Sequence, residues 1–338
     1  MKVVFSGYHN PNFITITEYI ERAFRDQGHE LVSFDDRSFL IPGRIRQRSK
    51  ILRDWDLNRL NDNLISLVLK NKPDLCIVTG GHRILPDTVK KIKNIGVIPV
   101  LWTIDFPLDF DPIIKAAPFY DHIFCGGTEA QVLLKQAGIK KTYWLPFACD
   151  PDQHKPLELG REDKDNYKND IVFVGSHYPN REETLKQIID FDLGVWGPGW
   201  RELTKDENLR KAIRGGMVKP CEWVKIFNTA KIIIIIHYKD GKVLDYQASP
   251  KVYEALSCKG FALVNDQRDV LSLFEDGKHL VIFKDTKDLR QKIDYYLNDP
   301  EKRKEIAQNG YNYVLANHTY SHRIKRMLSV IKETDGKS

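Results

Sequence analysis

The residue types best suited to bind a charged ligand lie together in the segment Lys231–Asn265. Within it, the unbroken isoleucine run Ile232–Ile236 predicts a strand buried on both faces of a parallel sheet, and this strand ends at His237. A polar loop leads from there to Ser249 and Pro250, which suit the cap and the first position of a helix. The free amide groups and positive dipole end of a helix that begins just beyond a buried strand attract phosphate groups.

Two charged side chains fall in the first turns of this predicted helix. The ammonium of Lys251 could neutralise a phosphate, and the carboxylate of Glu254 could accept hydrogen bonds from sugar or ribose hydroxyls. The alternative is an ordinary exposed ion pair, because residues three apart are neighbours on a helix surface. His237 has the same ambiguity, since it is either a ligand-site residue or the end of a strand.

The elements that would position these residues alternate along the whole chain. Short apolar runs, such as Val3–Ser6 and Ile171–Val174, alternate with amphipathic stretches, which is typical of a doubly wound parallel α/β sheet. We expect two Rossmann-like domains whose sheet edges face a central cleft. Their predicted bounds are 1–150 for the first domain, 151–170 for a charged linker, 171–315 for the second domain, and 316–338 for a C-terminal helix that could pack back on the first domain.

The composition excludes several classes of protein. The chain has 338 residues, is 42% hydrophobic, and carries 52 basic and 46 acidic residues, a mild excess that does not demand nucleic acid as a partner. The longest apolar run is far shorter than the roughly 20 residues of a membrane-spanning helix. Five scattered cysteines and a start that leads directly into a strand predict a cytoplasmic protein, which could associate with the inner membrane face.

Several motifs in the expected order resemble a known family. They include FVGSHYPNREETL (173–185), VWGPGW (195–200), SPKVYEALSCKGF (249–261), LFEDGKHLVIF (273–283) and IAQNGYNYVLANHTYSHR (306–323). With these motifs the chain is similar to GT-B glycosyltransferases, and within them to the CgeB-like group. The resemblance implies a nucleotide-sugar donor, UDP-linked first of all, bound by the second domain, and an acceptor received by the first.

The family pattern also implies roles for particular residues. Glu254 would hold donor hydroxyls, Lys251 would neutralise the diphosphate, and Gly175 and Ser176 would let the backbone approach the phosphates, with Arg181 nearby. His237 and Ser249 complete the expected donor site.

The chain departs from the family pattern at two positions. Retaining relatives have a second glutamate eight residues before Glu254, where this chain has Tyr246, and Lys259 stands where a glycine is usual. The first departure puts the retaining mechanism in doubt, whereas the second affects only a local turn.

Transfer with inversion needs a base that takes the proton of the acceptor hydroxyl. Asp105 and His82 follow predicted first-domain strands and are the candidates, with Asp105 preferred. Gly7 and His9 follow the first strand and could face the acceptor, although a plain turn there is an equal interpretation.

Neither a metal nor a cofactor is expected. Asp54-Trp55-Asp56 and Asp109-Phe110-Asp111 fit the D-x-D pattern that binds a divalent cation in other transferases, but the first begins a helical pattern and the fold class differs. No cysteine or histidine spacing fits a metal site.

One basic segment could locate a partner. Arg37–Arg53 has six basic residues, no acid, and interleaved large apolar side chains. An anionic membrane face, a lipid-diphosphate acceptor, a phosphorylated polymer or DNA would suit it, and a solvated loop before a helix is the alternative.

The predicted function is glycosyl transfer to a hydroxyl of an envelope, spore-coat, lipid-linked or other polymer acceptor. The alternatives are a nucleotide-sugar epimerase of the same fold, which would need no acceptor, and a sugar-nucleotide-binding protein without activity.

Overall fold

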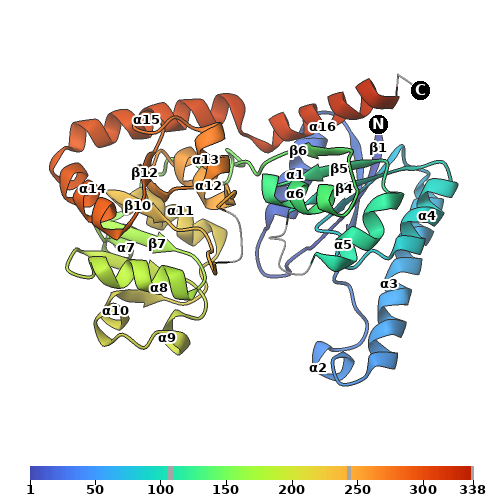
Figure 1. Cartoon of the computed structure of the whole chain (residues 1–338), viewed down its shortest axis with the longest axis horizontal. Helices are drawn as coiled ribbons and strands as arrows, with labels where there is room; N and C mark the ends of the chain where they lie inside the picture. Colours follow the sequence, from blue (N-terminus) through green and yellow to red (C-terminus); the bar gives the residue numbers. More distant parts are fainter. Residues whose placement is uncertain (105–109, 242–244, 336–338) are drawn as a thin grey trace. The chain divides into compact units, whose positions relative to one another are not determined.

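The computed structural model describes residues 1–104, 110–241 and 245–335, which form two compact units (Figure 1). The first unit contains Met1–Pro146 and the C-terminal helix that begins at Tyr320, and the second contains Phe147–Thr319. Each unit is built on its own six-stranded parallel sheet flanked by helices. The predicted α/β architecture of two doubly wound parallel sheets is confirmed.

The sheet of the first unit has the strand order β2-β1-β3-β4-β5-β6. Its strands are β1 (Lys2–Gly7), β2 (Glu30–Asp35), β3 (Leu75–Thr79), β4 (Ile98–Thr103), β5 (His122–Cys125) and β6 (Thr142–Trp144). The central strands are buried on both faces, and for this reason they read as continuous apolar runs. The strand order reverses between β1 and β3, and doubly wound sheets bind ligands at the carboxyl ends of such a pair.

Helices cover both faces of this sheet. They are α1 (Ile16–Asp26), α2 (Gly43–Arg46), α3 (Lys50–Asn71), α4 (Pro86–Asn94), α5 (Asp111–Ala116), the 3-10 helix η2 (Ala117–Phe119), α6 (Thr128–Gln136) and α16 (Tyr320–Asp335). The C-terminal helix α16 packs on α1, where the rings of Tyr19 and Tyr320 lie 6.1 Å apart. The Nε atom of Arg323 donates a hydrogen bond to the carbonyl of Pro146 at 2.8 Å, which ties α16 to the end of the first unit.

The sheet of the second unit has the order β12-β11-β10-β7-β8-β9. Its strands are β7 (Ile171–Val174), β8 (Leu193–Trp196), β9 (Ile213–Gly215), β10 (Ile232–Ile235), β11 (Ala262–Asn265) and β12 (Val281–Phe283). The order reverses between β7 and β10, so the expected ligand position lies at their carboxyl ends. The edge strand β9 was not predicted, because its three residues are not fully buried and carry no apolar run.

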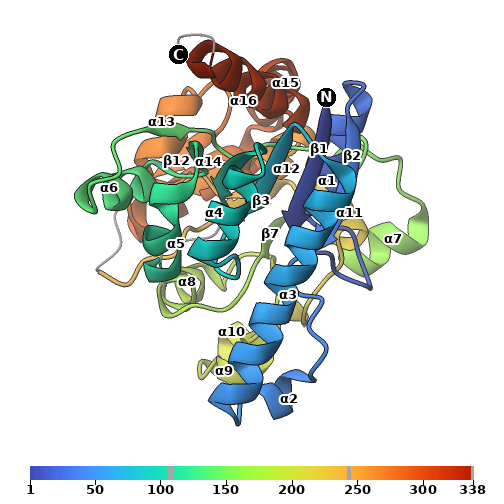
Figure 2. The same cartoon turned by 90° about the vertical axis from the view of Figure 1, so that its right-hand side faces the viewer.

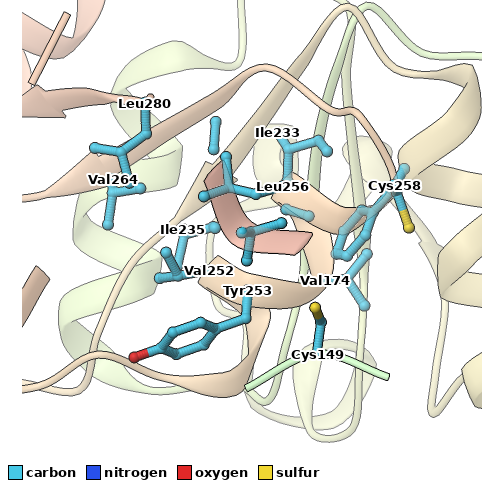
Figure 3. Packing of buried hydrophobic residues seen from close by; sticks show 14 of the residues in the cluster. Cys149, Val174, Ile233, Ile235, Val252, Tyr253, Leu256, Cys258, Val264 and Leu280 are labelled. Atoms are coloured by element: carbon cyan, nitrogen blue, oxygen red, sulfur yellow. The ribbon is translucent and has the colours of Figure 1, made fainter. Parts of the chain in front are cut away.

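Helices pack on both faces of this second sheet as well. They are α7 (Arg161–Tyr167), α8 (Pro179–Leu185), the 3-10 helix η3 (Lys186–Ile188), α9 (Trp200–Leu203), α10 (Glu207–Ala212), α11 (Pro220–Thr229), α12 (Pro250–Ser257), α13 (Arg268–Leu273), α14 (Thr286–Asn298) and α15 (Pro300–Asn317). Figure 3 shows Val252 and Leu256 of α12 among the buried side chains that include Ile233 and Ile235 of β10. Because the face of α12 that carries Val252 and Leu256 is buried, the helix is held against β10, the strand that precedes it in the chain.

The segment 151–170 is not a free linker but a part of the second unit. The amide of Leu157 donates to Oδ1 of Asn228 at 2.8 Å, and Asp163 forms an ion pair with Lys225 at 2.8 Å. Its high charge suggested a linker, whereas Asp163 of this segment pairs with Lys225 of α11. The described units divide between Pro146 and Phe147 rather than at residue 150.

Candidate functional site

The predicted donor-site residues gather at the strand-order reversal of the second unit. Gly175 and Ser176 follow β7, His237 follows β10, and Arg181 lies in α8. Ser249 occupies the N-terminal cap position of α12, although its side chain makes no capping hydrogen bond. Direct contacts, described below, connect the ends of β7, β10 and α12.

Arg181 spans the two strand ends at the reversal. Its Nε donates to the carbonyl of Ile236 at 2.8 Å, and its Nη1 donates to the carbonyl of Ser176 at 2.8 Å. Burial lowers the pKa of Arg181 to about 10. In the described parts of the chain no carboxylate forms an ion pair with this partly buried guanidinium, and a cation that is shielded from water without an acidic partner favours an anionic ligand.

His237 connects the end of β10 to the start of α12. Its Nε2 accepts a hydrogen bond from the amide of Ser249 at 3.0 Å, so its Nδ1 carries the proton and donates to Oδ1 of Asn265 at 2.8 Å. The backbone amide of His237 donates to the same oxygen. Both ring nitrogens are thus engaged within the protein. The structure therefore shows that His237 positions the start of α12, and its assignment to the donor site stays a prediction.

This buried imidazole should make stability depend on pH. Burial lowers the pKa of His237 to about 4, from an ordinary value of 6.5. As the pH falls, the unfolded chain binds this proton before the folded chain does. The stabilisation that neutral His237 contributes is therefore fully present above pH 6.5 and is lost as the pH falls toward 4, a loss of roughly 3 kcal/mol. We expect His237→Gln, which keeps an acceptor for the Ser249 amide, to remove this component. Chemical unfolding of wild type and variant from pH 7 to pH 4.5 measures the difference.

His9 provides a control, because its contribution to stability should change with pH in the opposite direction. Its hydrogen bond to Glu21, at 2.8 Å, raises the pKa of His9 against the effect of burial. The stabilisation by this pair is present below pH 6.5 and is lost as the pH rises through the raised pKa. His9→Gln should therefore cost more stability at low pH than at high pH. If His237→Gln and His9→Gln changed stability in the same direction with pH, the environments assigned to the two histidines would be wrong.

Glu254 is buried within a cluster of charged and aromatic groups. It is 3% exposed, and its Oε2 accepts from the ammonium of Lys251 at 2.6 Å. Burial alone would raise the pKa of Glu254, but Lys251 and His154 outweigh it, and the net pKa lies below the ordinary value. The ammonium of Lys251 also lies 3.5 Å from the ring centre of Trp223 in α11. Lys251 is therefore fixed from two sides, by a carboxylate and by an indole face.

His154 is a member of this cluster that the sequence did not indicate. Its Nδ1 accepts from the amide of Asp150 at 3.1 Å, so the proton is on Nε2, which lies 3.9 Å from Oε1 of Glu254. Burial lowers the pKa of His154, against the opposing effect of Glu254. The 3.9 Å separation exceeds a hydrogen bond, so Oε1 keeps acceptor capacity. The expectation that Glu254 receives donor hydroxyls stays a prediction.

The turn after β7 is tightly packed from behind. The carbonyl of Gly175 accepts a hydrogen bond from Nε1 of Trp200 at 2.7 Å. A Cβ atom on Gly197 would lie 1.9 Å from the same carbonyl oxygen, and Gly197 has a φ of +147°. Gly197 thus allows β7 and β8 to end side by side, and this close approach holds the Gly175-Ser176 turn in place.

Tyr246, which replaces the first glutamate of the retaining pattern, lines a pocket that also includes Ile236 and Asn265. This pocket of about 820 Å³ lies beside the ends of β10, β11 and β12. The guanidinium of Arg268 lies 4.6 Å from the ring centre of Tyr246, and the neighbouring Asp245 pairs with Lys239 at 3.0 Å. No carboxylate stands at the Tyr246 position, and the adjacent acid is already paired.

The candidate residues of the first unit follow the strands at its own order reversal. Gly7 ends β1, His9 follows it, and His82 follows β3. A Cβ on Gly7 would lie 2.8 Å from Oγ1 of Thr79, so packing alone accounts for this glycine. Asp105, the preferred base, lies outside the described residues.

The Asp54-Trp55-Asp56 motif has a structural explanation. Asp56 is fully buried and accepts hydrogen bonds from the amides of Leu40 and Ile41 at 3.0 and 2.9 Å. Asp109 of the second motif lies outside the described residues. Across the described ranges, no three His, Cys, Asp or Glu residues gather as a metal site would require. Within those ranges, too, no helix is long and apolar enough to span a membrane.

Known proteins share this sequence pattern and this fold. Residues 181–329 match the protein family described as glycosyl transferase-like. The spore protein CgeB of Bacillus subtilis (strain 168) is 20% identical over 263 residues, which cover 74% of this chain and 80% of CgeB.

Two solved structures illustrate the shared fold. Sucrose-phosphate synthase from Thermosynechococcus elongatus has a TM-score of 0.71 at 11% identity, over 100% of both chains. HepE from Anabaena, in complex with UDP and glucose, has a TM-score of 0.66 at 11% identity, over 98% of this chain and 100% of HepE. The predicted resemblance is thereby confirmed: the chain has the GT-B fold, matches the glycosyl transferase-like family over residues 181–329, and is similar to CgeB over most of its length.

Proposed function

We propose that this protein transfers a sugar from a nucleotide-sugar, bound by the second unit, to an acceptor hydroxyl. The observation that carries the proposal is the guanidinium of Arg181, which bridges the ends of β7 and β10 and has no acidic partner among the described residues. A diphosphate at this strand-order reversal would supply the missing negative charge. The match to the glycosyl transferase-like family supports sugar transfer as the use of such a site.

The residues of the site suit the charge that develops during transfer. As the glycosidic bond breaks, negative charge grows on the leaving diphosphate, and fixed cations and amide groups stabilise it best. Arg181 and Lys251 would supply the cations, and the backbone after Gly175 and Ser176 would supply close approach. His237 would keep the start of α12 in place through the Ser249 amide. We propose that these groups act without a metal ion.

Glu254 would serve the donor in two ways. Its Oε2 fixes the ammonium of Lys251, and its Oε1, which lies 3.9 Å from Nε2 of His154, would accept a donor hydroxyl, foremost one of the ribose. For the acceptor, we propose that Asp105 or His82 of the first unit takes the hydroxyl proton. The order reversal between β1 and β3, which His82 follows, supports a ligand position in that unit.

The proposed donor is UDP-linked and the proposed acceptor is an envelope, spore-coat, lipid-linked or other polymer hydroxyl. HepE, which shares the fold, was solved with UDP and glucose, and this supports UDP as the nucleotide. CgeB is a spore protein, which supports a spore-surface acceptor among these choices.

The test is incubation of the purified protein with UDP-, GDP-, dTDP-, CDP- and ADP-linked sugars, with and without an envelope fraction, followed by phosphorus and proton NMR. We expect that one nucleoside diphosphate is released and that its release is faster when the envelope fraction is present. Isomerisation of the sugar with donor alone would identify an epimerase instead. Binding without any turnover would show that the chain recognises the nucleotide but has lost the chemistry.

A further inference from the structure

The segment that joins β2 to α3 projects from the first unit. Helix α2 and the N-terminal part of α3 extend beyond the end of the sheet, as both views show (Figures 1 and 2). This projecting tip, residues 37–55, contains the basic segment Arg37–Arg53. It takes no part in the proposed donor site.

The projecting tip has a fixed conformation. The buried carboxylate of Asp56 accepts two amide hydrogen bonds from Leu40 and Ile41 and a third bond from Nε of Arg59 at 3.2 Å. The guanidinium of Arg46 lies 3.5 Å from the ring centre of Phe39. A fully buried aspartate and a cation–π contact thus fold the segment back on α3.

The same segment leaves its largest apolar side chains in solvent. The exposed fractions are 65% for Leu40, 53% for Ile45, 81% for Ile51 and 51% for Trp55. Ile51 and Trp55 are four residues apart in α3 and therefore lie on one side of the helix. A short folded segment that exposes four large apolar side chains is a candidate docking surface.

Unpaired positive charge surrounds these apolar groups. Arg44, Arg48 and Lys50 are exposed, and none forms an ion pair with a carboxylate of the described residues. Amphipathic segments that combine basic groups with Leu, Ile and Trp bind the surface of anionic bilayers, where the apolar groups enter the headgroup region. Tryptophan is favoured at this depth. Nucleic acid would satisfy the charges but would leave the aliphatic side chains exposed.

We propose that the projecting tip docks this protein on an anionic lipid bilayer. The basic side chains attract the surface, and Leu40, Ile45, Ile51 and Trp55 insert at the level of the headgroups. The docking depends on the first unit alone, so it holds or fails separately from the proposed sugar transfer.

The test is co-sedimentation of the full chain with vesicles of phosphatidylcholine alone or with 30% phosphatidylglycerol, at two salt concentrations. Two double variants separate the contributions: Leu40→Ser with Ile51→Ser, and Arg44→Gln with Arg48→Gln. The matched control is Leu69→Ser, because Leu69 is also half exposed on α3 but lies roughly 27 Å from Ile51 along the helix axis. Circular dichroism and melting curves verify that each variant is folded.

Wild type and Leu69→Ser should bind only the anionic vesicles, less at high salt, and each double variant should lose at least tenfold in partitioning. Absence of wild-type binding, or equal binding by the apolar double variant, would overturn the proposal. It would also be overturned if duplex DNA or polyphosphate bound more tightly than the vesicles and bound the Leu40→Ser, Ile51→Ser variant equally well.

Discussion

Glu254→Gln is expected to weaken binding of the nucleoside diphosphate by about 30-fold, which corresponds to about 2 kcal/mol for a hydrogen bond to a charged group. Sugar turnover should fall by at least as much. The substitution keeps the shape of the side chain and one acceptor oxygen, but it removes the negative charge that strengthens hydrogen bonds from donor hydroxyls. Inorganic pyrophosphate, which has no hydroxyl groups from ribose, should bind as tightly as before or more tightly, because Lys251 is no longer neutralised. Calorimetric titration of both ligands measures the contrast.

The matched control is Glu222→Gln. Glu222 lies near the start of α11, another helix of the second unit, where its carboxylate accepts from the amide of Lys219 at 2.7 Å. This variant should bind nucleotide like the wild type. If Glu254→Gln left nucleotide binding unchanged while remaining folded, Glu254 would have no role in the donor site. If it weakened nucleotide and pyrophosphate equally, its role would be limited to holding Lys251.

Gly197→Ala is expected to destabilise the second unit by at least about 3 kcal/mol. The φ of +147° is accessible to glycine but strained for alanine, and the new Cβ would lie 1.9 Å from the carbonyl oxygen of Gly175. The ends of β7 and β8 would have to separate. For a unit of this size the melting temperature should fall by about 6 °C or more. Scanning calorimetry measures the shift.

Nucleotide binding should weaken as well, because the displaced carbonyl belongs to the turn proposed to approach the phosphates. Gly216→Ala is the control, since a Cβ there meets no atom within 4 Å. That variant should melt like the wild type. An unchanged melting temperature for Gly197→Ala would show that the two strand ends are not packed as closely as the structure has them.

The fold could be predicted because its signals are local. Buried parallel strands are continuous apolar runs, as in Ile232–Ile236, and glycines such as Gly28 end the helices between them. The strand β9 lacked that signal because it lies at a sheet edge with partly exposed residues. The segment 151–170 was predicted to be a linker because its charges are visible in the sequence, whereas its contacts with Lys225 and Asn228 of α11 are not.

The candidate site was predictable where its residues follow strand ends. Gly175 and His237 could be placed because the sheet order brings the ends of β7 and β10 together. His154 could not, since it precedes Glu254 by one hundred residues and only tertiary folding brings the two side chains together. The role of His237 was equally hidden, because the sequence cannot show that both ring nitrogens are already bonded.

Binding of a nucleoside diphosphate by the cations at the strand-order reversal of the second unit underlies the proposed sugar transfer. The most direct measurement is a calorimetric titration of UDP, GDP, dTDP, CDP and ADP into wild type and Lys251→Gln. We predict that one of them, UDP first of all, binds the wild type with a Kd below about 1 mM, that the matching nucleoside does not bind, and that the variant loses at least tenfold in affinity. Failure of every diphosphate to bind the folded wild type would contradict the claim.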